Sequence, residues 1–62
     1  MYTAEDLRAV EERAQKFLPT ATSELSAYLR AIEDYVRNKR RVLPFEQAEH
    51  LEIQLLVHYG LE

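Results

Sequence analysis

The first third of the chain alternates apolar and polar residues at steps of three and four, which predicts an amphipathic helix near residues 4–18. Thr3 and Asp6 stand three positions apart at its start, a spacing at which two side chains can cap a helix reciprocally. Pro19 ends the segment, because proline disfavours helical geometry at the preceding residue. The apolar positions span about 140° of the helical projection, and they are Ala4, Leu7, Val10, Ala14, Phe17 and Leu18.

A second amphipathic segment near residues 23–37 has a narrower apolar face, of about 120°. Thr22 or Ser23 can cap its start, and Asn38 is the expected C-terminal cap. Because the connection between the two segments is short, we expect the second helix to fold back beside the first as an antiparallel hairpin. The apolar positions are Leu25, Tyr28, Leu29, Ile32, Tyr35 and Val36.

The third segment, near residues 44–59, begins at a proline and ends at Gly60, the only glycine of the chain, as helices commonly do. It is apolar around more of its circumference than a single core requires. Ile53 and Val57 point about 80–120° away from Phe45 on the helical projection. A helix that is apolar on two sides usually has a neighbour on both. Its broad main face comprises Phe45, Ala48, Leu51, Leu55, Leu56 and Tyr59.

These three segments predict an all-α fold. We expect a small three-helix bundle, an antiparallel helical hairpin plus a third helix, in a single domain that spans residues 1–62. A domain of 62 residues buries only about 60% of its unfolded surface, so its stability is marginal. The chain has no cysteine, so disulfides cannot add stability, and oligomerisation or close helix packing must do so. We therefore expect the bundle to self-associate.

Two histidines on the third segment, His50 and His58, do not have the spacing of a metal site. Eight residues separate them, which is about 12 Å along a helix axis, so one ion cannot bind both. Glu46 and His50 could supply two ligands, but nothing else completes the roughly three protein ligands that zinc requires. We expect no metal and no cofactor within one chain, and a site completed across a dimer is the only alternative.

Nothing in the sequence predicts an enzyme. The hydroxyl groups between Thr20 and Ser26 lie where helix caps are needed, and no histidine stands near them in sequence to serve as a base. A phosphate-binding glycine loop is excluded, because the chain has one glycine. We therefore expect no catalytic residues and no small-molecule substrate.

The strongest charge feature is a basic run at the end of the second segment. It gathers half of the eight lysines and arginines within five positions. Such a run can bind nucleic-acid phosphates, or it can neutralise the C-terminal end of a helix. The net charge of −3 and the glutamates at the start of the third segment disfavour nucleic acid, so a nucleic-acid-binding regulator is the alternative function. The candidate anion-binding residues are Arg37, Lys39, Arg40 and Arg41.

The excess apolar surface of the third helix predicts a non-enzymatic protein-interaction module, a small regulator or adaptor that forms a homodimer. The favoured dimer is an antiparallel crossing of this helix with its copy, in which Glu49 or Glu52 approaches the basic run of the other subunit. The predicted partner-binding residues are Ile53, Val57, Leu56, Tyr59 and Tyr35.

The sequence also carries an expectation about location. Its start lacks the basic and then apolar order of a signal peptide. No apolar run approaches the roughly 20 residues that span a bilayer. We therefore expect a soluble, cytoplasmic protein that does not bind a membrane.

Overall fold

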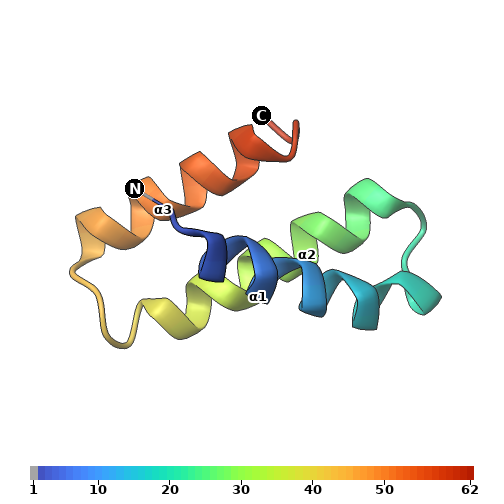
Figure 1. The fold of residues 1–62 in the computed structure, drawn as a ribbon, viewed down its shortest axis with the longest axis horizontal. Helices are drawn as coiled ribbons and strands as arrows, with labels where there is room; N and C mark the ends of the chain where they lie inside the picture. The colour runs from blue at the N-terminus through green and yellow to red at the C-terminus, as the bar shows by residue number, and fades with distance from the viewer. Residues whose placement is uncertain (1) are drawn as a thin grey trace.

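The computed structural model describes residues 2–62, which form three α-helices joined by short connections (Figure 1). The predicted all-α bundle is confirmed. The elements are α1 (Ala4–Phe17), a 3₁₀ turn η1 (Leu18–Thr20), α2 (Glu24–Lys39) and α3 (Phe45–His58).

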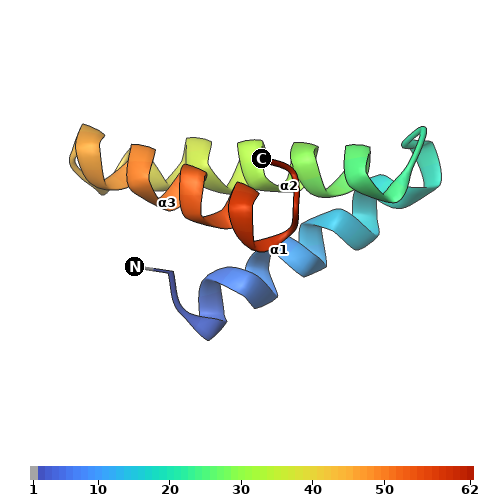
Figure 2. The same cartoon turned by 90° about the horizontal axis from the view of Figure 1, so that it is seen from above.

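The central helix of the bundle is α2, because α1 and α3 each pack against it. The helices α2 and α3 run antiparallel, and α1 crosses one side of the pair (Figures 1 and 2). The third helix is shorter than the second and stops before it reaches the first turns of α2 (Figure 1). The N-terminal part of α2 therefore has α1 on one side and no helix on the other.

Side-chain caps begin the first two helices, as the sequence indicates. The Thr3 side chain accepts a hydrogen bond from the Asp6 backbone N–H at 3.3 Å, and the Asp6 carboxylate accepts the Thr3 N–H at 2.8 Å. This reciprocal pair is a capping box, which satisfies backbone donors that have no partner within the helix. At the start of α2, Ser23 rather than Thr22 is the cap, and it accepts from the Ser26 N–H at 3.1 Å.

The expected cap at Asn38 is wrong, because α2 continues to Lys39. The Asn38 side chain instead donates to the Asp34 carbonyl one turn earlier, at 3.2 Å. No residue here takes the left-handed conformation of an asparagine cap, and the chain leaves the helix through a turn in which the Leu43 N–H donates to the Lys39 carbonyl at 2.9 Å.

The end of α3 is as predicted. Gly60 has a φ of +73°, a conformation that costs glycine little and other residues more. The Leu61 N–H donates to the Leu56 carbonyl at 2.8 Å, and the Gly60 N–H donates to the Val57 carbonyl at 3.1 Å. These two bonds are a Schellman motif, which ends the helix at the only glycine of the chain.

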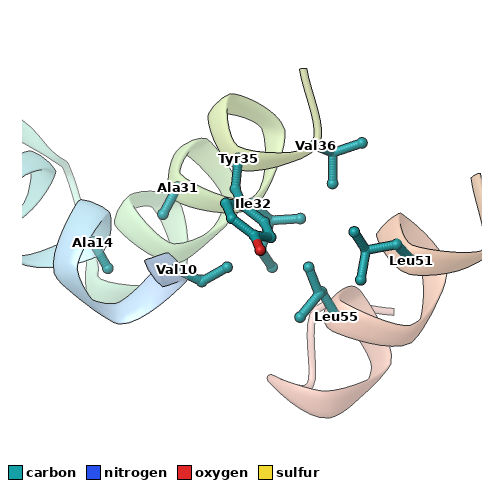
Figure 3. Close-up of a cluster of buried hydrophobic side chains, with 8 residues drawn as sticks. All are labelled: Val10, Ala14, Ala31, Ile32, Tyr35, Val36, Leu51 and Leu55. Atoms are coloured by element: carbon teal, nitrogen blue, oxygen red, sulfur yellow. The ribbon is translucent and has the colours of Figure 1, made fainter. Parts of the chain in front are cut away.

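The core lies where the three helices meet (Figure 3). Leu51 and Leu55 project from α3 towards Ile32 of α2, which is fully buried. Small side chains sit on the α1–α2 contact and let these two helices approach closely. The buried cluster comprises Val10, Ala14, Ala31, Ile32, Tyr35, Val36, Leu51 and Leu55.

Three large apolar residues that the pattern places on core faces are exposed instead. Leu25 and Leu29 belong to the first two turns of α2 and are exposed, and Figure 1 shows α3 ending before it reaches the start of that helix. Phe45 begins α3 and is 71% exposed, with the Arg40 guanidinium 5.7 Å from the centre of its ring. In each case the helical angle suits a core position, but the side chain remains exposed.

Candidate protein-interaction surface

The outer side of α3 carries two large apolar side chains that nothing in the chain covers. Ile53 is 48% exposed and Val57 is 57% exposed. Each stands two residues from the buried Leu55, which places it about 160° around the helix from that core position. The structure thus shows α3 docked by one face, with an apolar strip on the other.

A second exposed pair lies on the first turns of α2. Leu25 is 58% exposed and Leu29 is 41% exposed. The rings of Tyr28 and Tyr59 are 4.9 Å apart, which marks the place where the end of α3 meets α2. Leu25 and Leu29 flank Tyr28 in sequence, so they lie near the same end of the molecule as Val57.

Leu56 is the neighbouring apolar residue of α3. It is half-buried and packs against the core. On the helical projection it stands between the buried Leu55 and the exposed Ile53. We call the resulting set the outer apolar surface, and its residues are Leu25, Leu29, Ile53, Leu56 and Val57.

Tyr35 does not belong to this surface, contrary to its predicted role in partner binding. Its side chain is buried, and its hydroxyl donates a hydrogen bond to the Asp6 carboxylate. Because Asp6, the acidic member of the capping box, accepts this hydroxyl, the bundle itself satisfies the polar group of Tyr35.

Tyr59 is likewise tied to its own chain. Its hydroxyl lies 3.3 Å from the Leu7 carbonyl and 3.1 Å from the Glu11 carboxylate, both on α1. Burial first, and then the Glu11 carboxylate, raise the pKa of Tyr59 above its ordinary value. The side chain is half-buried, so it lies at the margin of the outer apolar surface and holds α3 against α1.

The contact between Asp6 and Tyr35 shifts the pKa of both groups. Burial and the neighbouring Asp6 carboxylate raise the pKa of Tyr35 above its ordinary value. For Asp6, burial raises the pKa, but hydrogen bonds from Tyr35 and Thr3 outweigh it and hold the pKa of the carboxyl below its usual value. The pair thus consists of a neutral hydroxyl and an ionised carboxylate at neutral pH.

Half of the basic run is engaged within the chain. Arg40 forms ion pairs with Glu49 at 3.0 Å and with Glu52 at 3.5 Å, and the Lys39 ammonium lies 5.5 Å from the centre of the Tyr35 ring. Arg37 and Arg41 are exposed and form no ion pair within residues 2–62.

These pairs change both charge predictions. The attraction that was expected between subunits, from Glu49 or Glu52 to the basic run, is made within one chain. Glu52 is partly buried, and its charge is paired with Arg40 there. The nucleic-acid alternative is left with two unengaged arginines on a chain of net charge −3, which weakens it.

A polar cleft of about 710 Å³ opens between the start of α1 and the start of α3. The Asp6 carboxylate, which lines this cleft, already accepts hydrogen bonds from Thr3 and Tyr35. Within residues 2–62 no three acidic or histidine side chains are grouped closely enough to hold a metal ion. The cleft is lined by Thr3, Glu5, Asp6, Tyr35, Lys39, Leu43, Glu46, Gln47, His50 and Leu51.

The two histidines lie apart, as their spacing indicates. His50 is exposed at the cleft. The Nδ1 atom of His58 is 3.0 Å from the Tyr2 hydroxyl, and its ring meets that of Tyr59 edge to face. His58 therefore helps to hold the N-terminal residues against the end of α3.

Comparison of the chain with models of known protein families, with curated proteins and with solved structures finds no match. Across residues 2–62, none of the helices has the length and apolar character needed to cross a bilayer. Any function must therefore be argued from the surface itself.

The sequence pattern found Ile53, Val57 and Leu56 but missed Leu25 and Leu29. On a helical projection, Leu25 stands within about 20° of the buried Ile32 and so has the angle of a core residue. Only the point at which α3 stops makes Leu25 exposed, and no local signal in α2 carries that information.

Proposed function

We propose that this protein is a non-enzymatic interaction module, a small regulator or adaptor, which binds another polypeptide through the outer apolar surface. The observation that carries the proposal is that two helices in contact each leave two large aliphatic side chains exposed, Ile53 and Val57 on α3 and Leu25 and Leu29 on α2. Single exposed apolar residues are normal on protein surfaces, whereas a contiguous group commonly marks a contact site.

The size of the surface sets the expected strength of binding. Full burial of a leucine, isoleucine or valine side chain is worth about 1.5–3 kcal/mol, so covering four half-exposed ones contributes about 3–6 kcal/mol. A partner that buries a similar apolar area doubles this figure, and the loss of translational and rotational freedom offsets several kcal/mol of it. We therefore expect binding in the micromolar to millimolar range, as is typical of reversible regulatory contacts.

The polar groups of the chain support a contact role more than a catalytic one. The Asp6 carboxylate and the Tyr35 and Tyr59 hydroxyls are paired within the bundle. The Arg13 and Asp34 side chains pair across α1 and α2 at 2.9 Å. These polar groups hold the helices together. The exposed side chains of the outer apolar surface have no such role in the fold.

The test is affinity capture with the whole chain as bait in a lysate of its cell of origin. The face variant combines Ile53→Arg with Val57→Arg. The matched control combines Gln15→Arg with Val42→Arg, which adds the same charge at exposed positions away from the surface. We expect the unmodified chain and the control to retain the same proteins and the face variant to lose them. Equal retention by all three baits contradicts the proposal.

A further inference from the structure

We propose that the polypeptide that covers this surface is a second copy of the same chain, with the two α3 helices crossing antiparallel about a two-fold axis near residue 55. This inference rests on the proposed function and names its partner. It is carried by three observations: the spacing of the exposed strip, the distribution of charge along α3, and the area that the surface offers.

The exposed strip of α3 is complementary to itself. Ile53 and Val57 stand one helical turn apart on the outer side of α3, on either side of residue 55. A two-fold axis at that point brings Ile53 of each subunit opposite Val57 of the partner subunit. Both contacts of an isologous interface are then made by the same two residues, as two-fold symmetry requires.

Charge along α3 selects the antiparallel direction. The acidic residues of the helix, Glu46, Glu49 and Glu52, all precede Ile53, and none follows it before Gly60. In a parallel pair the acidic halves lie side by side and repel. In the antiparallel pair Glu49 stands six residues, or about 9 Å, before the axis, so it lies opposite position 61, past the end of the partner's α3 and away from the acidic half of that helix. Arg40 also partly neutralises Glu49 within its own chain.

A dimer interface of ordinary size needs residues from α2 as well as from α3. A standard interface buries about 800 Å² on each partner, which is nearly a fifth of the 4431 Å² surface of this chain. Ile53 and Val57 alone are too few for that. Leu56 on α3 and the exposed Leu25 and Leu29 on α2 are the further apolar side chains that can enlarge the contact. Because this apolar area is small, a weak dimer is expected.

Sedimentation equilibrium of the whole chain tests the dimer, from about 10 μM to about 1 mM, where a micromolar to millimolar Kd populates both species. We expect the average mass to rise from the 7.3 kDa of one chain towards twice that value. The face variant, Ile53→Arg with Val57→Arg, stays at the monomer mass, and the control, Gln15→Arg with Val42→Arg, follows the unmodified chain. Circular dichroism confirms that both variants are helical.

Cysteine cross-linking tests the register, because the chain has no cysteine of its own. A chain with Ile53→Cys is mixed with one carrying Val57→Cys under mild oxidation. Since these positions face each other across the axis, the mixed disulfide should exceed either self-linked species several-fold. Arg8→Cys, on the exposed side of α1, reports random collision. Predominant self-linking of the Ile53→Cys chain would show a parallel or shifted pair and overturn the register.

The two proposals fail separately. An unmodified chain that remains a monomer at about 1 mM overturns the dimer. If affinity capture still depends on Ile53 and Val57 in that case, the interaction module stands and its partner is a different protein. If capture does not depend on them either, both proposals are wrong.

Discussion

The α1–α2 contact and the α2–α3 contact differ in how much apolar surface they leave exposed on α1 and on α3. Ala14 of α1 and Ala27 and Ala31 of α2 are fully buried, so α1 and α2 approach closely. Their contact is closed by the Arg13–Asp34 ion pair at 2.9 Å and by the hydrogen bond from Tyr35 to Asp6. No large apolar side chain of α1 is exposed.

The third helix docks on α2 with one side only. Ala48, Leu51 and Leu55 are buried, while Ile53 and Val57 on the opposite side are about half exposed. The α1–α2 contact is thus closed by polar pairs, whereas α3 leaves two large aliphatic side chains uncovered. The variants below alter positions in each of these two parts.

The largest expected effect distinguishes the only two isoleucines of the chain, Ile32 and Ile53. Ile32 is fully buried between the helices, so Ile32→Ala should lower the free energy of unfolding by about 2–5 kcal/mol, enough to unfold a small domain. Ile53→Ala, the same change at an exposed site, should cost less than about 1 kcal/mol at low protein concentration. Urea denaturation of the two variants measures both, and equal losses would show that α3 packs differently.

The next effect concerns the hydrogen bond from Tyr35 of α2 to Asp6 of α1. Asp6→Asn removes a charged acceptor from the capping box and from Tyr35, and should cost about 1–2 kcal/mol at neutral pH. Tyr35→Phe removes one hydrogen bond and leaves the cap of α1 intact, so it serves as the matched variant. In urea denaturation, the loss of stability for Asp6→Asn should be at least as large as the loss for Tyr35→Phe. No loss of stability in either variant would contradict the role of the pair.

The same pair predicts a pH dependence. Because the folded pKa of Asp6 is lower than its unfolded value, its ionisation stabilises the fold above about pH 4, and this stability is lost as the pH falls through the folded pKa. Asp6→Asn should therefore flatten the acid side of the stability profile. The opposite holds for Tyr35, whose raised pKa adds stability below about pH 10 that disappears as the pH rises further. Denaturation curves measured from acid to alkaline pH check both signs.

At the end of α3, Gly60→Ala should lower stability by about 1 kcal/mol, because alanine disfavours a positive φ. A Cβ atom at this position meets no atom within 4 Å, so the cost is conformational and not steric. The melting temperature of the variant measures it. A variant as stable as the unmodified chain would indicate that the last turn of α3 is held by packing alone.

The smallest effect on stability should come from the surface ion pairs between Arg40 and α3. Arg40→Ala breaks the pairs with Glu49 and Glu52 and should cost about 0.2–1 kcal/mol, less in high salt. Arg37→Ala, which breaks no such pair, should change stability by less. Denaturation at low and high salt separates the two. A salt-independent loss for Arg40→Ala would point to its contact with the Phe45 ring instead.

The local sequence pattern was sufficient to find the three helices, the cap at Thr3, a cap at Thr22 or Ser23, and the excess apolar side of α3, because all of these depend on residues within a few positions of one another. It could not show that α3 stops short of Leu25. It also could not pair Tyr35 with Asp6, 29 positions away. Glu49 or Glu52 was expected to approach the basic run of the other subunit, but the turn between α2 and α3 brings both within reach of Arg40 in the same chain.

The most direct measurement of the central claim is the concentration dependence of the isoleucine δ1-methyl resonances. The chain has one isoleucine in the core, Ile32, and one on the outer apolar surface, Ile53. If a second molecule covers α3, the Ile53 resonance shifts between about 10 μM and about 1 mM, and the Ile32 resonance stays in place as an internal reference. Two resonances that are both unchanged over this range would show that the open side of α3 stays exposed and would contradict the dimer.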